Sequence, residues 1–206
     1  MKHHLVFLSS LAIFLSVNSS TTEQSQAKPA KVFQPIINEI TETIPSDLEM
    51  RLPTSIPAVN KNSIYASVAQ SDRQINVSLG DLDLDFFTVT ITNTPNCEQQ
   101  ENFLDCLVAV VGVAKDPIES QVQLDELVAD NKDKIVQTEL ATGVSSFYFT
   151  EADWQSIIWR QDNMAHLLIA QECSDRCISQ QELIDMAKSA VNEPAILSSD
   201  TSYYSF

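Results

Sequence analysis

Residues 156–191 constrain the fold more than any other stretch of the chain. Two strand-like segments, residues 156–160 and 164–172, flank the dipeptide Asp162-Asn163. Asp and Asn tolerate the positive backbone angles of a two-residue hairpin turn. After a short loop with two cysteines, residues 179–191 place apolar side chains at spacings of three and four, which is typical of a helix. The stretch therefore predicts a β-hairpin followed by a helix that packs on the sheet.

The predicted C-terminal helix has a clear beginning and end. Ser179 is followed three residues later by Glu182, which matches a capping box. Pro194 ends the helix because proline cannot continue it. The apolar stripe that would face the sheet consists of Leu183, Met186, Ala187, Ala190 and Val191.

From residue 63 onward the apolar pattern changes to a period of two, which indicates strands. We expect residues 75–79 to pair back on residues 64–68 through a turn at 71–73. The apolar run at 107–115 predicts a buried central strand, and Gly112 within it marks a bulge or a close approach of another segment. The predicted strands are 64–68, 75–79, 86–94, 107–115, 135–140 and 144–149, with a loop at 151–155.

Residues 86–94 alternate apolar side chains with threonines, which predicts a half-buried strand with its threonines on the second face. Residues 32–44 predict an N-terminal helix that Pro45 ends. The segment 50–53 is expected to be extended and held against the domain. A short helix is expected within residues 117–133.

These elements predict a single α+β domain over residues 32–194. Its antiparallel sheet would have about six to eight strands, with an N-terminal and a C-terminal helix packed on it. Residues 20–31 are polar and without periodicity, so we expect a disordered leader there. Residues 195–206 are expected to form a flexible tail.

The first 19 residues have the pattern of a secretory signal peptide. A basic start precedes an apolar run at residues 5–17, and small polar residues follow it. The run is shorter than the about 20 residues that a membrane-spanning helix needs. We expect cleavage after Ser19 and a periplasmic or extracellular protein with no further membrane segment; retention as an N-terminal anchor is the alternative.

The chain is strongly acidic. It has 12 Lys and Arg against 28 Asp and Glu, which gives a formal net charge of −16. Such a charge repels nucleic acid and anionic membrane surfaces, so a nucleic-acid partner is not expected. Solubility is the simplest role of the charge, and a basic partner or loosely bound divalent cations are the alternatives.

The four cysteines predict disulfides, because an even number of cysteines is usual in an exported protein. Proximity in the sequence favours pairing Cys97 with Cys106 and Cys173 with Cys177. A structural zinc site is the alternative. The eight residues between Cys97 and Cys106 exceed the spacing of two to four that paired zinc ligands use.

Between positions 143 and 189 the chain carries a pattern made by Gly143, Tyr148, Trp159, Arg160, Gln161, Asp162, Asn163, Leu168, Ser179, Glu182, Leu183, Ile184, Ala187 and Ser189. This pattern resembles a bacterial extracytoplasmic domain of unknown function, which also occurs in the outer parts of anti-sigma-factor-like proteins. That family has a glycine-led strand, a tryptophan-bearing hairpin and a Ser-x-x-Glu-Leu helix. The segment 50–53 and the pair Cys97 and Cys106 resemble exported bacterial proteins with the same ending. The resemblance implies an antiparallel sheet with helices and no catalytic residues.

Candidate sites for chemistry are few. Asp81, Asp83 and Asp85 would point to one side of a strand and could offer oxygen ligands to calcium, but a solvated strand edge is the favoured explanation for them. His166 lies beside Trp159 in the predicted hairpin, which favours a role in the sheet. Trp154, in the predicted loop, is a candidate for ligand binding at the surface.

We therefore expect a non-catalytic envelope or extracellular module without a cofactor. Its partner would be a protein or a small hydrophobic ligand. An exported hydrolase that uses acidic residues is one alternative, and a calcium-assisted structural protein is another. Paired carboxylates are too common in this chain for the sequence to select a catalytic pair.

Overall fold

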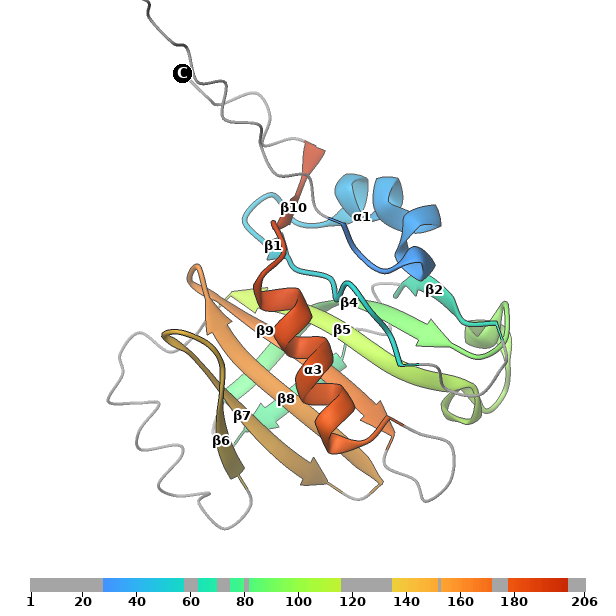
Figure 1. The fold of residues 1–206 in the computed structure, drawn as a ribbon. Helices are drawn as coiled ribbons and strands as arrows, with labels where there is room; N and C mark the ends of the chain where they lie inside the picture. The colour runs from blue at the N-terminus through green and yellow to red at the C-terminus, as the bar shows by residue number, and fades with distance from the viewer. Residues whose placement is uncertain are drawn as a thin grey trace, which may run out of the picture.

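The computed structural model describes residues 28–57, 63–69, 75–79, 82–115, 135–151, 153–171 and 178–199. Within these ranges the fold is α+β, with an eight-stranded antiparallel sheet, a two-stranded sheet and helices (Figure 1). The strand order is β2-β4-β5-β9-β8-β7-β6, and β3 pairs with β4 beside this path. The strands of the large sheet are β2 (Tyr65–Val68), β3 (Ile75–Leu79), β4 (Leu82–Thr92), β5 (Leu107–Lys115), β6 (Ile135–Ala141), β7 (Val144–Glu151), β8 (Trp154–Gln161) and β9 (Met164–Gln171).

The last four strands of the large sheet form a meander with short turns. Asp162 and Asn163 have φ angles of 54° and 61°, which confirms the predicted hairpin turn between β8 and β9. Gly143, with a φ of 79°, serves the turn between β6 and β7. The predicted loop at 151–155 is wrong, because β7 ends at Glu151 and β8 begins at Trp154.

The partners of β3 correct another prediction. β3 does not pair back on β2; both strands pair with β4. β4 has 11 residues, so Leu82–Phe86 can pair with β3 while Val89–Thr92 pairs with β2. Because β4 is long, it can pair with both β2 and β3. The short period-two patterns in the sequence could not show which strand β3 pairs with.

Both faces of the sheet are buried. On one face, Val89, Val111, Trp159 and Leu168 belong to the main core. On the other face, Phe86 packs in a second cluster, with Ala114, Ile158, Ala165 and Leu167. The prediction that β4 is half-buried is therefore wrong: Thr88, Thr90 and Thr92 on its second face are buried as well.

The absence of a side chain at Gly112 of β5 leaves room for the side chain of Phe86 on the neighbouring strand β4. A Cβ atom at Gly112 would lie 3.2 Å from Cδ1 of Phe86 and 3.3 Å from Cγ2 of Thr88. This confirms the predicted close approach, and the pairing of Gly112 with Thr88 continues without a bulge. A side chain at this position would push against the Phe86 ring, because the core is packed close to the density of a crystal.

The helices lie on the face of the main core. At the N-terminus a 3-10 helix, η1 (Lys31–Ile36), leads into α1 (Ile37–Thr43), so the predicted helix at 32–44 is divided, with Pro35 inside the 3-10 part. α3 (Gln180–Val191) lies over β8 and β9 in Figure 1. Its buried side chains are the predicted stripe, and the predicted capping box between Ser179 and Glu182 is present.

A small second sheet joins the two ends of the domain. β1 (Glu49–Met50) pairs with β10 (Ile196–Leu197) beside α1 (Figure 1). The predicted flexible tail therefore needs correction, because Ile196 is buried in this sheet. Met50 and Leu52 are also buried, which confirms that the segment at 50–53 is held against the domain.

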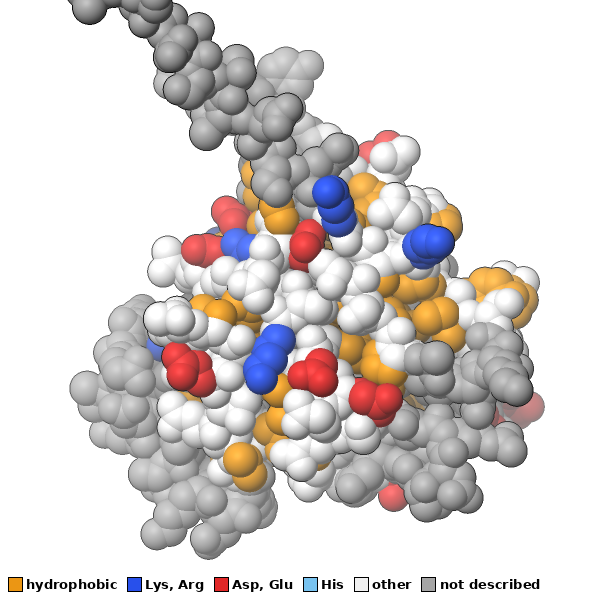
Figure 2. Space-filling model, in the orientation of Figure 1, with side chains coloured by type: hydrophobic (Ala, Val, Ile, Leu, Met, Phe, Trp, Pro, Cys, Tyr) orange, Lys and Arg blue, Asp and Glu red, His pale blue; other side chains and the backbone are white. Residues whose placement is uncertain are grey.

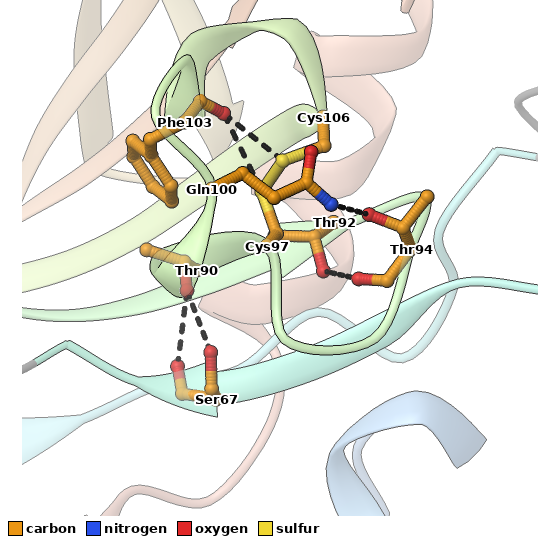
Figure 3. The surroundings of a disulfide bond; sticks show 8 residues. All are labelled: Ser67, Thr90, Thr92, Thr94, Cys97, Gln100, Phe103 and Cys106. Carbon is orange, nitrogen blue, oxygen red and sulfur yellow. Dashed lines mark hydrogen bonds between the residues drawn. A yellow bond between two sulfur atoms is a disulfide. The ribbon is translucent and has the colours of Figure 1, made fainter.

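A disulfide bond links Cys97 and Cys106, as the cysteine spacing predicted. It closes the loop between β4 and β5, which contains the short 3-10 helices η3 (Cys97–Gln99) and η4 (Phe103–Asp105) (Figure 3). Two side-chain hydrogen bonds strengthen the loop: Thr92 donates to the carbonyl of Thr94, and the Gln100 amide donates to the Thr94 hydroxyl. The loop therefore fixes the connection between two adjacent strands.

Other predictions fall outside the described residues. They are the signal peptide, most of the leader, the turn at 71–73, the helix at 117–133, and Cys173 and Cys177. Among the helices that the structure does describe, none has the length and apolarity to cross a bilayer.

Candidate functional site

An open groove lies between the N-terminal segment and β2. Its volume is about 480 Å³, and Ala30, Lys31, Val32, Ile56 and Ile64 line it. Four of these five side chains are apolar. In Figure 2, hydrophobic side chains gather on the side of the molecule where η1 and β2 lie. The groove therefore offers apolar contact area at the surface.

Three distant parts of the chain build the walls of this groove. One wall belongs to the start of η1, another to the extended segment after β1, and the third to the residue before β2. The backbone N–H of Ala30 donates to the carbonyl of Pro53 at 2.9 Å, which fixes the first two walls to each other. This backbone contact helps to shape the groove; Val32, Ile56 and Ile64 are partly buried, whereas Ala30 is buried.

The groove also carries a positive charge. Lys31 is exposed where η1 begins, in a chain with far more acidic than basic residues. A ligand with an apolar body and an anionic end would meet both kinds of surface here.

Apart from the groove, a cluster of polar side chains lies inside the protein, where the β8–β9 hairpin meets α3. The rings of Trp159 and His166 stack with their centroids 5.1 Å apart and their planes 16° apart. Both residues are buried. Burial, as the larger cause, and the positive charge of Arg51 together lower the pKa of His166 to about 4, against smaller opposing effects of Asp162 and of the Gln161 backbone. His166 is therefore neutral at pH 7.

Arg51 connects this region to the N-terminal part of the domain. Its guanidinium donates to the carboxylate of Asp162 at 2.6 Å and to the backbone carbonyl of Glu193. Nearby, the amide of Gln161 donates to the carbonyl of Val191 at 3.2 Å. The hairpin turn, the end of α3 and the segment after β1 are thus joined by hydrogen bonds.

The structure places the predicted ligand-binding tryptophan elsewhere. Trp154 is the first residue of β8, paired with Glu151 and Gln171, and its side chain is half-buried. The prediction of a loop position is wrong, and Trp154 is not among the groove residues.

The structure describes two of the three aspartates of the acidic stretch. Asp83 and Asp85 lie on β4, opposite Ser78 and Asn76 of β3, and among the described strands β3 alone pairs with this part of β4, so the stretch has one open side. Asp85 is exposed, whereas Asp81 lies outside the described residues. Within the described part of the chain, no three His, Cys, Asp or Glu side chains are arranged to hold a metal ion.

Sequence reasoning missed the groove because its residues carry no common motif. Ile56 lies in a proline-rich stretch and Ile64 opens a strand pattern, about 30 residues from Val32. Only the tertiary pairing of segments brings them together. Neither a protein-family model, nor a curated protein, nor a solved structure matches the chain, and the family resemblance stays a prediction.

Proposed function

We propose that the protein is an exported, non-catalytic module that binds a small hydrophobic ligand in the groove between η1 and β2. The groove is the observation that carries this proposal. Its volume of about 480 Å³ falls within the range of about 300–1,000 Å³ that is usual for small-molecule sites. Ala30, Val32, Ile56 and Ile64 would contact the apolar part of the ligand.

Two observations support export. The amino-terminal pattern is that of a signal peptide. The Cys97–Cys106 disulfide suits an oxidising compartment, since thiols in the cytosol are kept reduced. We expect a periplasmic or extracellular location on these grounds.

A binding role, as opposed to catalysis, is supported by the position of His166. The chain has three histidines, and His3 and His4 lie in the predicted signal peptide, which leaves His166 as the histidine of the domain. It is 1% exposed, and its ring is stacked on Trp159 in the core, so the ring is not accessible from the surface. We therefore assign His166 a role in packing the core.

The proposal is tested with an uncharged apolar fluorophore such as N-phenylnaphthylamine. Fluorescence titration should show saturable binding to the wild-type protein. Ile64→Glu should weaken binding by at least about tenfold, because a carboxylate in the groove would lose hydration. Val136→Glu is the matched control, since Val136 is 53% exposed on β6 and is not a groove residue.

Two outcomes would contradict ligand binding in the groove. One is the lack of saturable binding to the wild-type protein. The other is equal weakening by Ile64→Glu and Val136→Glu, which would place the fluorophore elsewhere. Circular dichroism of both variants shows whether the fold is kept.

A further inference from the structure

The groove between η1 and β2 combines an apolar wall with a single basic side chain. Lys31 lines it together with Ala30, Val32, Ile56 and Ile64, whose side chains have no polar atom. Among the described residues that line the groove none is Asp or Glu, although the chain has 28 of these residues and a formal net charge of −16. The groove therefore has a charge of the opposite sign to that of the whole protein.

The ammonium group of Lys31 is available to a ligand. Two other basic side chains are engaged in ion pairs, Arg51 with Asp162 and Lys115 with Asp47, whereas Lys31 has no acidic partner among the described residues. Lys31 is exposed. A lysine in such a position lays its methylene groups along an apolar surface and keeps its ammonium in water. An anion that binds here would displace water and no acidic side chain.

The apolar wall of the groove is aliphatic. Ala30, Val32, Ile56 and Ile64 offer methyl and methylene groups, and none of the described lining residues is aromatic. A ring in a ligand gains from stacking on rings in its site, and this groove has none to offer among those residues. An aliphatic chain gains its affinity from the exclusion of water and from dispersion contacts, which these side chains supply.

We propose that the ligand of the groove is a single-chain carboxylate, with its aliphatic chain on the apolar wall and its carboxylate paired with the Lys31 ammonium. This inference rests on the proposed function and adds the charge and the chain type of the ligand. One lysine supplies one positive charge, which balances one carboxylate. A dianionic phosphate would retain an uncompensated charge beside a strongly acidic protein, which repels it.

The positive charge should select the carboxylate by a modest factor. Because Lys31 is exposed, water screens the ion pair, and it should strengthen binding about two- to fivefold at low salt. The net negative charge of the protein acts against every anionic ligand. The effect of Lys31 therefore has to be compared with the loss of an equal charge elsewhere, and Lys28 offers this control. It is exposed in the same N-terminal segment and is not a groove residue.

Displacement of N-phenylnaphthylamine by decanoate and by 1-decanol, at pH 7 and low salt, tests the inference. Lys31→Met should weaken the binding of decanoate about two- to fivefold more than Lys28→Met does. Neither variant should change the binding of 1-decanol, because the alcohol has the same chain without a charge. Lys31→Arg keeps the positive charge and should bind decanoate as the wild-type protein does.

Salt distinguishes the ion pair from the apolar contact. Raising the salt concentration from about 0.01 M to about 1 M shortens the Debye length from about 30 Å to about 3 Å. The difference between Lys31→Met and Lys28→Met should then disappear for decanoate. The binding of 1-decanol should not weaken, because apolar contacts do not depend on screening.

The outcomes separate this inference from the proposed function. Equal effects of Lys31→Met and Lys28→Met on decanoate, with saturable binding of 1-decanol, would overturn the carboxylate site and leave an apolar groove that binds neutral molecules. Binding of the fluorophore that neither chain displaces would also overturn the inference alone. If the wild-type protein binds none of the three compounds, the inference and the proposed function are both wrong. Circular dichroism shows that each variant keeps the fold.

Discussion

Gln155 and Gln161, six positions apart on β8, fasten the two ends of α3 to the sheet. The Gln155 amide donates to the carbonyl of Ile178 before the helix, and the Gln161 amide donates to the carbonyl of Val191 at its end. Six residue steps of strand span about 20 Å, and the 12 residues of α3 span about 18 Å. The similar lengths allow one strand to anchor both ends of α3.

Replacing Gln155 with leucine should lower the free energy of unfolding by about 1–3 kcal/mol, because the buried carbonyl of Ile178 loses this donor. The Tyr148 hydroxyl, 3.3 Å from the Gln155 carbonyl oxygen, also loses this contact. Urea denaturation measures the change. Gln137→Leu on β6 is the control, since Gln137 is exposed and should change stability little. Equal effects of the two variants would show that Gln155 does not anchor the helix.

Gly112→Ala should destabilise the protein by about 1–3 kcal/mol, because the new methyl group meets the Phe86 side chain at 3.2 Å. Phe86→Leu in the same chain should recover part of this loss, which a double-mutant cycle measures. Gly143→Ala is a useful comparison. It should cost roughly 1 kcal/mol through its positive φ, and Phe86→Leu should not relieve it. A cycle without coupling between Gly112 and Phe86 would contradict the close packing.

Replacing Cys97 and Cys106 together with alanine should lower the free energy of unfolding by about 2–3 kcal/mol. The cysteines are nine positions apart, and the chain-entropy model gives this value for so short a loop. The double variant leaves Cys173 and Cys177 in place, whereas a general reductant would also act on the disulfide that is predicted between them. Thermal unfolding of both proteins without reductant measures the loss, and an unchanged melting temperature would show that the loop is held without its crosslink.

The capping box of α3 should make stability depend on pH. Hydrogen bonds from the backbone N–H and hydroxyl of Ser179 lower the pKa of Glu182 below its ordinary value. This contribution is present above pH 4.5 and is lost as the pH falls through the lowered value. Glu182→Gln should thus be less stable than wild type at pH 7, and the difference should shrink at pH 3.

Ser179→Ala should cost about 1 kcal/mol at pH 7, the usual loss for an N-cap. Gln180→Ala, in the same exposed turn, serves as the control. Urea denaturation at both pH values measures all three variants. A pH-independent difference between Glu182→Gln and wild type would mean that the ionised carboxylate does not cap the helix.

The features that the sequence predicted correctly are local. Asp162-Asn163 identified its hairpin because few residues tolerate positive φ, and Ser179 with Glu182 identified a helix start. The continuous apolar run at 107–115 identified the central strand, because a strand buried on both faces needs no alternation. Each of these signals lies within a few residues.

The features that the sequence could not predict depend on distant segments. β4 is long enough to pair with both β2 and β3, and nothing in the short patterns distinguishes this from a β2–β3 hairpin. The strand at Ile196–Leu197 exists because Glu49–Met50 lies beside it. The groove arises in the same way, from three segments that meet only in the folded protein.

The most direct test of the binding role is native mass spectrometry of the protein purified from its host without detergent. We expect the wild-type protein to carry an added mass that corresponds to a small apolar molecule. Ile64→Glu should lose this mass, while Val136→Glu should keep it. A wild-type protein with no added mass, or an adduct of equal occupancy in Ile64→Glu, would contradict a ligand in the groove between η1 and β2.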